Sequence, residues 1–419
     1  MDRQAARLKM LIQANEVLAN IESLVELLPQ LLRLAQDVTG AEASSIMLYD
    51  EERNVLRFAL AMNDVLGEEK MKELKTGFEL PMGKGIAGWV AENQSSLNVV
   101  DAQNDPRFSN AADQKTGFVT NCILCVPIIH RDKLMGVVQV LNSTAKECFD
   151  LDDKELLESF GHLAGVALVR SDLLLQRLNQ QKLETQLEAA SRIQKQFNPV
   201  QPELDGGDLI WGSSVPAQFV GGDLYDFIPI SDGSWYIYIA DVSGKGLPAA
   251  LIMSALWTRI RAEALNEKDP GAMLESINKG AWEFMNGKMF ATMVLMRYEP
   301  ASGKCSYAVA GHTPPLHVAG GEVRELERPF GMPVGIMDDG DFTTAEFVLG
   351  HGESLIIVTD GVDEARAADG EFFGEERLLK TLKESGEPPL GDKLIQAVSQ
   401  WRADTPPNDD TTVVEIFRG

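Results

Sequence analysis

The chain has 419 residues, of which 44% are hydrophobic and 24% charged, a composition typical of a globular protein with two or three domains. Its 63 acidic and 38 basic residues give a formal charge of −25 at pH 7, which disfavours nucleic acid and anionic lipid as partners. No apolar run approaches the roughly 20 residues of a membrane helix, and the polar N-terminal sequence has no signal-peptide core, so we expect a cytoplasmic protein without membrane insertion.

The first part of the chain shows the pattern of helices flanking an antiparallel sheet. Apolar residues recur at near-helical spacing over residues 8–28 and again over 31–38, where the run stops at Gly40. Pro29, between the two runs, is expected to kink or restart the helix. Five strand-like runs follow, at residues 45–49, 55–62, 97–100, 122–129 and 134–141. Helical signals resume over 152–169, so the pattern predicts an α+β domain.

Two motifs in this part have both a chemical and a structural interpretation. Cys122 and Cys125 form a Cys-x-x-Cys pair, but residues three apart on a strand point to opposite faces, and no second pair completes a zinc site. Gly83 to Gly88 match the dinucleotide fingerprint, but Pro81 before them cannot donate to the ladder of a central strand. We therefore expect packed cysteines and a structural turn, with metal, redox or nicotinamide binding as the alternatives.

The order of several motifs over about residues 20–170 resembles that of a GAF sensor domain. The motifs are Ala41–Tyr49, Pro81–Val90, Val99–Asp101 followed by Asp105–Phe108, and Cys125–Ile128. The resemblance implies that this part of the chain dimerises and binds a small-molecule ligand.

Some GAF domains that bind cyclic nucleotides carry an Asn-Lys…Phe…Asp-Glu signature late in the fold. Asn142, Phe149 and Asp153 match it, whereas Ser143 and Lys154 replace the second and last members. The sequence therefore disfavours a cyclic nucleotide and leaves the ligand unidentified.

A polar-rich helical segment follows, free of glycine and proline until Pro199. Its seam residues are Leu168, Leu175, Leu178, Leu183, Leu187, Ala190, Gln194 and Phe197. The step of five residues between Leu178 and Leu183 slips the register by one, a feature that a rotational signal relay would use. A short parallel coiled coil joining two copies fits this spacing; an amphipathic helix packed on its own domain is the alternative.

The chain is expected to divide into an N-terminal helix (1–20), the sensor domain (21–168), the coiled-coil linker (169–199) and a C-terminal domain (200–419), with a break at Asn198–Pro202. Strand-like runs in the last part lie at 235–240, 291–298, 306–310, 344–348, 354–358 and 412–417. Helical runs lie at 248–263, 270–285, 374–385 and 390–401. Many strands with two pairs of helices predict a β-sandwich with helices on its outer faces.

Four separated aspartates lie beside glycine or next to β-prone apolar runs: Asp223, Asp241, Asp360 and Asp409. Carboxylates gathered at strand ends repel one another unless a cation lies between them. Two divalent metal ions holding a shared water would permit hydrolysis of a phosphate ester at neutral pH. Each aspartate taken alone is equally a common turn residue, so the prediction depends on the ordered set.

The C-terminal part resembles, over about residues 195–419, a PPM-type metal-dependent Ser/Thr phosphatase of the SpoIIE-like branch. Seven ordered motifs carry the resemblance: Val220–Phe227, Ala240–Ala250, Met289–Thr292, Ala310–Pro315, Pro333–Gly335, Thr359–Ala365 and Asn408–Thr412. The resemblance implies an α/β/β/α sandwich with a centre of two Mn²⁺ or Mg²⁺ ions.

The resemblance also implies the ligand set. Asp223 and Asp241 would contact or bridge the ions, with the backbone carbonyl of Val242 completing one coordination sphere, and Asp360 and Asp409 would bind from the opposite side of the sandwich. Oxygen-only ligands suit Mg²⁺ and Mn²⁺ rather than zinc.

Further residues of the motifs have predicted supporting roles. Asp226, Asp363 and Asp410 are candidates to orient waters or ligands, and His312 is expected to fix a loop rather than act as a general acid. Asn198-Pro199 departs from the Leu-Pro usual in this branch, and no arginine corresponds to the phosphate clamp of eukaryotic relatives.

Together these features predict a homodimeric, sensor-regulated phosphatase acting on phosphoserine or phosphothreonine of a protein, by resemblance an anti-sigma-factor antagonist in a partner-switching pathway. The helical runs 248–263 and 270–285 directly follow Asp241, so we expect the linker to act on the site through them. One alternative is a catalytically silent phosphatase-like scaffold controlled by the sensor ligand. The other is a cyclic-nucleotide phosphodiesterase, disfavoured because the five histidines are scattered rather than clustered.

Overall fold

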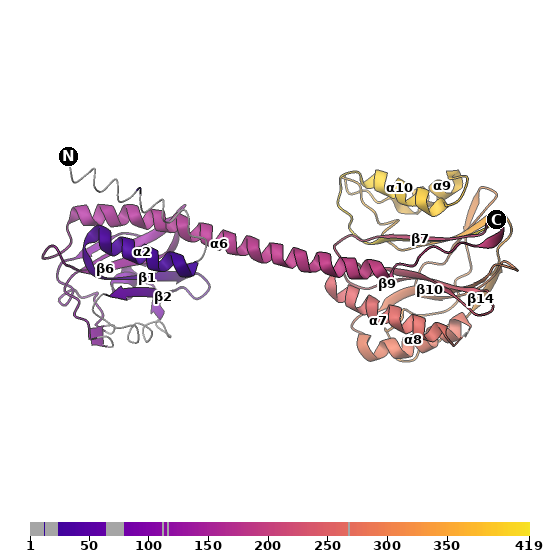
Figure 1. The fold of residues 1–419 in the computed structure, drawn as a ribbon, viewed down its shortest axis with the longest axis horizontal. Helices are drawn as coiled ribbons and strands as arrows, with labels where there is room; N and C mark the ends of the chain where they lie inside the picture. The colour runs from indigo at the N-terminus through magenta and orange to yellow at the C-terminus, as the bar shows by residue number, and fades with distance from the viewer. Residues whose placement is uncertain (1–11, 13–23, 64–78, 111–112, 115–116, 267–268) are drawn as a thin grey trace. The chain divides into compact units, whose positions relative to one another are not determined.

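The computed structural model describes residue 12 and residues 24–63, 79–110, 113–114, 117–266 and 269–419 (Figure 1). The chain forms two compact units, residues 1–182 and 183–419. The predicted N-terminal helix lies, except for Ile12, outside the described residues. None of the helices within the described ranges is both long and apolar enough to cross a membrane.

The first unit is built on a six-stranded antiparallel sheet in the order β3-β2-β1-β6-β5-β4. The strands are β1 (Ala41–Asp50), β2 (Val55–Asn63), β3 (Glu79–Pro81), β4 (Leu97–Val99), β5 (Ile123–His130) and β6 (Lys133–Ser143). Each of the five predicted runs overlaps one of these strands. The unpredicted β3 is three residues long and ends in Pro81 at the sheet edge, where a missing N–H costs no ladder hydrogen bond.

Helix α2 (Leu24–Thr39) continues through Pro29, so the helix does not restart there. Leu27, Leu31 and Leu32 have no exposed surface and pack into one core with the strands, which fixes the helix on both sides of the proline. This packing outweighs the roughly 3 kcal/mol cost of proline inside a helix. The helix ends as predicted before Gly40, whose φ is +63°.

The glycine motif forms a turn rather than a nucleotide-binding loop. Helix α4 (Gly85–Asn93) follows β3, which pairs antiparallel at the sheet edge instead of opening a parallel βαβ unit. A Cβ at Gly88 would lie 2.7 Å from the carbonyl oxygen of Pro81, so close packing explains this glycine. Cys122 and Cys125 are buried and unpaired, and burial raises the pKa of the Cys125 thiol, as expected of packed cysteines.

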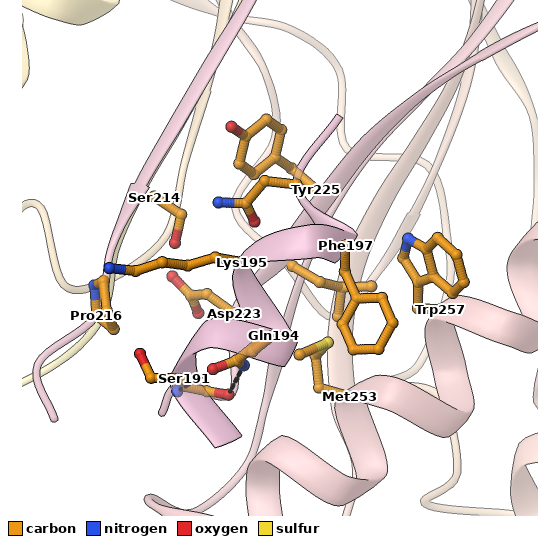
Figure 2. A pocket seen from close by; sticks show the side chains of 13 residues that line it. Ser191, Gln194, Lys195, Phe197, Ser214, Pro216, Asp223, Tyr225, Met253 and Trp257 are labelled. Atoms are coloured by element: carbon orange, nitrogen blue, oxygen red, sulfur yellow. Dashed lines mark hydrogen bonds between the residues drawn. The ribbon is translucent and has the colours of Figure 1, made fainter. Parts of the chain in front are cut away.

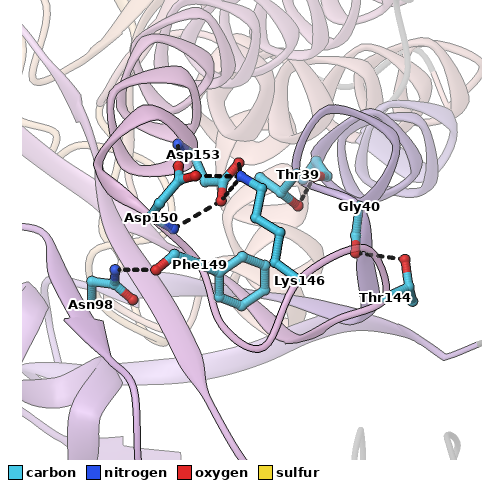
Figure 3. A network of polar contacts seen from close by, with 9 residues as sticks. Thr39, Gly40, Asn98, Thr144, Lys146, Phe149, Asp150 and Asp153 are labelled. Carbon is cyan, nitrogen blue, oxygen red and sulfur yellow. Dashed lines mark hydrogen bonds and ion pairs between the residues drawn. The ribbon is translucent and has the colours of Figure 1, made fainter.

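The long helix α6 (Leu151–Gln194) begins at a charged cap shown in Figure 3. The N–H of Asp150 donates to Asp153 Oδ2 at 2.9 Å, and the N–H of Asp153 donates to Asp150 Oδ1 at 3.0 Å. Lys146 Nζ lies 2.5 Å from Asp150 Oδ2 and 2.9 Å from Asp153 Oδ2, and its hydrogen bond lowers the pKa of Asp150 to about 2. Reciprocal carboxylate contacts of this kind fix the first turn of a helix.

The second unit contains two five-stranded antiparallel sheets, with the orders β14-β11-β10-β9-β8 and β13-β12-β15-β16-β7. The strands are β7 (Leu209–Val215), β8 (Leu224–Pro229), β9 (Trp235–Val242), β10 (Ala291–Glu299), β11 (Lys304–Ala310), β12 (Leu316–Ala319), β13 (Glu322–Glu325), β14 (Ala345–Val348), β15 (Glu353–Val358) and β16 (Thr411–Arg418). The six predicted runs correspond to β9, β10, β11, β14, β15 and β16, whereas β7, β8, β12 and β13 were not predicted.

Helices cover both outer faces of this sandwich, as predicted (Figure 1). The helices are α7 (Leu247–Ala264), α8 (Pro270–Met285), α9 (Gly374–Glu384) and α10 (Leu390–Arg402). One core fills the space between α7, α8 and their sheet, a second lies between the sheets, and a third lies under α9 and α10. The α/β/β/α architecture brings the ends of β8, β9, β15 and β16 to the same edge of the sandwich.

Candidate metal centre

The four predicted aspartates come from both sheets. Asp223 directly precedes β8 and Asp241 is the penultimate residue of β9, whereas Asp360 follows β15 and Asp409 precedes β16. The two sheets are tied together here through Asp223.

Two hydroxyl groups of the opposite sheet hold the Asp223 carboxylate. Thr359 Oγ1 donates to Asp223 Oδ2 at 2.8 Å, and Thr412 Oγ1 donates to the same atom at 2.6 Å. Thr412 Oγ1 also lies 2.8 Å from Ser214 Oγ on β7. Neither threonine was predicted, although each stands within three residues of a predicted ligand in the motifs Thr-Asp-Gly and Asp-Asp-Thr-Thr.

The carboxylates interact strongly enough to change one another's protonation. Burial and then repulsion by Asp241 raise the pKa of Asp223 well above its usual range. Burial and then repulsion by Asp409 raise the pKa of Asp241 to about 6. Asp360 reaches the surface, yet loss of surrounding water and repulsion by Asp241 raise its pKa to about 7. The four predicted residues therefore form one electrostatic cluster with an excess of negative charge.

One cation partly balances this cluster. Lys245 Nζ lies 2.8 Å from Asp409 Oδ2 and also donates to the carbonyl of Asn408. The hydrogen bond to Asp409 raises the pKa of Lys245, so the lysine is charged at neutral pH. Half of its side chain is exposed, which leaves the ammonium group accessible from the solvent.

The donors present suit hard divalent cations. Across the described ranges, no three His, Cys, Asp or Glu side chains close tightly enough around one point to enclose an ion by themselves. Mg²⁺ characteristically binds through one or two carboxylates and keeps several waters, so the arrangement fits such an ion better than one needing a full protein cage. A Cβ at Gly222 would lie 2.8 Å from the carbonyl oxygen of Val242, so this glycine permits the close approach of the two predicted ligand segments.

Asp410 positions the backbone that carries the predicted ligand Asp223. Its carboxylate accepts the N–H groups of Ala217 at 2.7 Å, Gly222 at 2.7 Å and Asp223 at 3.4 Å. A Cβ at Gly221 would lie only 2.3 Å from Asp410 Oδ2. The acidic side chain next to Asp409 thus fixes the loop that carries Asp223.

Asp226 does not join the cluster, which corrects its predicted role. It has no exposed surface, and its carboxylate is paired with Arg261 of α7 at 2.6 Å to Nε and 3.0 Å to Nη2. This pair joins β8 to α7 instead of orienting a ligand or water. Asp363 lies near Asp360 and contributes to its raised pKa.

His312 behaves as expected of a loop residue. It is buried, its Nδ1 lies 3.0 Å from the carbonyl oxygen of Thr313, and burial lowers its pKa to about 4. The ring is therefore neutral at pH 7 and is not poised to donate a proton.

We expect the metal-free protein to lose stability as the pH rises from about 4 to about 7. The folded state keeps protons on Asp241 and Asp360 up to pKa values of about 6 and 7, whereas the unfolded chain has released them near 3.8. The folded state then binds more protons, so the free energy of unfolding falls with pH across this window. Urea unfolding between pH 4 and 8 measures the free energy of unfolding. Its decrease with pH should be smaller in Asp241→Asn than in the wild type; an equal decrease in that variant would contradict the raised pKa of Asp241.

Two family models match the chain, and between them they cover most of it. One, described as the GAF domain, matches residues 22–169, and the other, described as Stage II sporulation protein E (SpoIIE), matches residues 231–418. The second match includes Asp241, Asp360 and Asp409 and begins after Asp223.

Two curated relatives are similar over about half of this chain. The Phosphoserine phosphatase RsbU of Bacillus subtilis is 32% identical over 213 residues, which are 49% of this chain and 61% of the relative. Protein IcfG of Synechocystis is 29% identical over 266 residues, 56% of this chain and 41% of the relative. The chain thus spans less than two thirds of the length of either relative.

A solved structure supports the fold. The SiaA-PP2C domain of Pseudomonas aeruginosa aligns with 57% of this chain and 98% of its own, with a TM-score of 0.50 and 24% sequence identity.

Proposed function

We propose that the chain is a metal-dependent serine/threonine phosphoprotein phosphatase regulated through its GAF-like part, because it matches the GAF model over residues 22–169 and the SpoIIE model over residues 231–418. The observation that carries the proposal is the convergence of Asp223, Asp241, Asp360 and Asp409 from two sheets into one electrostatic cluster. Similarity to a phosphoserine phosphatase supports the choice of substrate group.

The SpoIIE-like motifs and the contacts around them suggest a role for each residue of the proposed site. Asp223, Asp241, Asp360, Asp409 and the Val242 carbonyl would hold two Mn²⁺ or Mg²⁺ ions. Such ions, when bound, lower the pKa of a shared water and neutralise charge on phosphoryl oxygens.

The surrounding residues position these ligands and meet the substrate. Thr359 and Thr412 both donate to the same oxygen of Asp223, and Asp410 holds the loop that carries this aspartate. Lys245 stands at the exposed rim, where its ammonium group attracts the substrate phosphate.

The proposed substrate is phosphoserine or phosphothreonine on a small protein, an anti-sigma-factor antagonist, as the SpoIIE-like motifs imply. A small ligand of the GAF domain would provide the regulatory signal. A cytoplasmic location agrees with four unpaired cysteines, since reducing compartments keep thiols free.

We further propose a homodimer joined through α6. The seam residues Leu175, Leu178 and Leu183 are each 55–59% exposed along this helix. Large exposed leucines on one seam of a helix are the apolar surface that a second copy of the helix would bury.

The test is phosphate release from a phosphoserine-bearing antagonist protein by the full chain. We expect release that requires Mn²⁺ or Mg²⁺ and stops when a chelator is added. Phosphate release that continues after the chelator is added would contradict the proposed two-metal centre. Binding of Mn²⁺ without turnover on any phosphoprotein would favour the silent-scaffold alternative.

A further inference from the structure

The last turn of α6 contacts the loop that carries Asp223 (Figure 2). Gln194 Nε2 donates to the carbonyl oxygen of Gly221 at 2.7 Å, and the N–H of Gly221 donates to Gln194 Oε1 at 3.1 Å. One side-chain amide thereby satisfies both polar groups of a single backbone residue. The coiled-coil prediction had placed Gln194 on the seam between two copies, whereas here it binds its own domain.

The loop is held from two sides. On one side, Asp410 accepts the N–H of Gly222 at 2.7 Å and lies too close to Gly221 for any Cβ there. On the other side, Gln194 is the side chain that pairs with both the N–H and the carbonyl oxygen of Gly221. Asp223 is two residues away, so a displaced Gly221 moves the aspartate backbone.

A ring contact keeps Gln194 in place. Phe197, in the 3₁₀ turn Lys195–Phe197 that follows α6, packs on Trp257 of α7 with ring centroids 4.8 Å apart. The guanidinium carbon of Arg261 lies 4.6 Å from the centroid of the same Trp257 ring, so three groups stack in succession. These contacts restrict both translation of the end of α6 along its axis and rotation about that axis.

The helix end and the aspartate also line one pocket. Its walls include Ser191, Gln194, Phe197, Asp223 and Trp257 (Figure 2). The space on one side of Asp223 is therefore bounded by α6.

From this geometry we infer that Gln194 is a positioning residue that fixes the Gly221–Asp223 loop for metal binding. The inference rests on the proposed function, because Asp223 is given the role of a metal ligand there. Gln194 acts on Asp223 through the backbone of Gly221. Helix α6 is continuous from Leu151 to Gln194. A rotation or shift of this helix would therefore displace the Gln194 amide that holds Gly221, two residues before the proposed metal ligand Asp223.

The test compares Gln194→Met with the matched control Gln186→Met in the full-length protein. Methionine keeps the unbranched length of glutamine and loses both hydrogen bonds, and Gln186 is exposed on the same helix. We expect Gln194→Met to bind Mn²⁺ roughly tenfold more weakly, the lower end for residues that orient metal ligands. Electron paramagnetic resonance of free Mn²⁺ measures this without an activity assay.

Kinetics separate positioning from general damage. The half-saturating Mn²⁺ concentration should rise by the same factor, while kcat at saturating Mn²⁺ stays within about twofold of the wild type, because a bound ion restores the loop. Gln186→Met should match the wild type in both measurements. A lowered kcat with unchanged Mn²⁺ affinity would overturn the inference.

Gln194→Asn serves if the methionine variant does not fold. It keeps the amide but is one methylene shorter, so it cannot span to Gly221, and the same loss of Mn²⁺ affinity is expected. If the wild type binds Mn²⁺ and both variants bind it equally well, the role of Gln194 is wrong and the proposed function stands. A wild type that binds no Mn²⁺ would overturn both.

Discussion

Asp241→Asn is expected to lower metal-dependent phosphatase activity about 10³-fold, which corresponds to about 4 kcal/mol of transition-state stabilisation. Asp241 lies at the centre of the acidic cluster and is repelled by Asp409 and Asp410 while facing Asp223. An amide in its place lacks the negative charge that a divalent ion requires. The initial rate of phosphate release with saturating Mn²⁺ measures the loss, and Asp360→Asn should behave similarly.

Stability distinguishes this loss from unfolding. Removing one of several mutually repelling carboxylates should leave the metal-free variant at least as stable as the wild type at pH 8. Asp404→Asn, an exposed site outside the motifs, makes the same chemical change and should keep full activity. An inactive Asp241→Asn that is also markedly less stable in urea would point to a structural role instead.

Gly361→Ala is expected to lower activity about 100-fold and stability by about 1–3 kcal/mol. A Cβ at Gly361 would lie 1.8 Å from the carbonyl oxygen of Asp410, a distance that only movement of the backbone can relieve. Gly361 follows Asp360, and Asp410 follows Asp409, so relief of the clash separates two proposed ligands. Phosphate release and urea unfolding measure the two effects.

Gly370→Ala is the control for this substitution. Gly370 has a φ of +88° in an exposed turn, and a Cβ there would meet nothing within 4 Å. Alanine should cost about 1 kcal/mol through the left-handed backbone alone and leave activity unchanged. If Gly361→Ala retained wild-type activity, the close contact between the two aspartate segments would be irrelevant to function.

Elements with local start and stop signals were predictable from the sequence. The bounds predicted for α8 are those observed, because Asp269 caps the first turn by accepting the N–H of Ala272 at 3.1 Å, Pro270 opens the helix and Asn286 ends it with a φ of +48°. Strands β12 and β13 have four residues each and lack a run long enough to show a pattern. The helix does not restart at Pro29 because burial of the neighbouring leucines overrides the local preference of proline.

Sequence motifs single out the four aspartates of the proposed site, but they do not reveal the contacts that organise them. Motifs name Asp223, whereas its partner Thr412 lies 189 residues away and is identified only when two sheets are stacked. Asp226 shares a motif with Asp223, yet it faces Arg261 on a helix 35 residues later. Gln194 fits a heptad seam equally well, and only the tertiary structure shows that Gly221 is its partner. Sequence motifs identify which residues are chemically suited to a site, but they do not show which distant residues those side chains contact.

Strand β16 lies inside its sheet, between β15 and β7, and its partner Leu209 stands more than 200 positions ahead of Phe417. During synthesis on the ribosome, β7 and β15 emerge long before the strand that must separate them. Until residue 418 leaves the exit tunnel, the half-made domain exposes two unpaired strand edges, and Asp409 cannot meet Asp223. A nascent chain therefore lacks the complete acidic cluster, and unpaired strand edges of this kind are prone to aggregation.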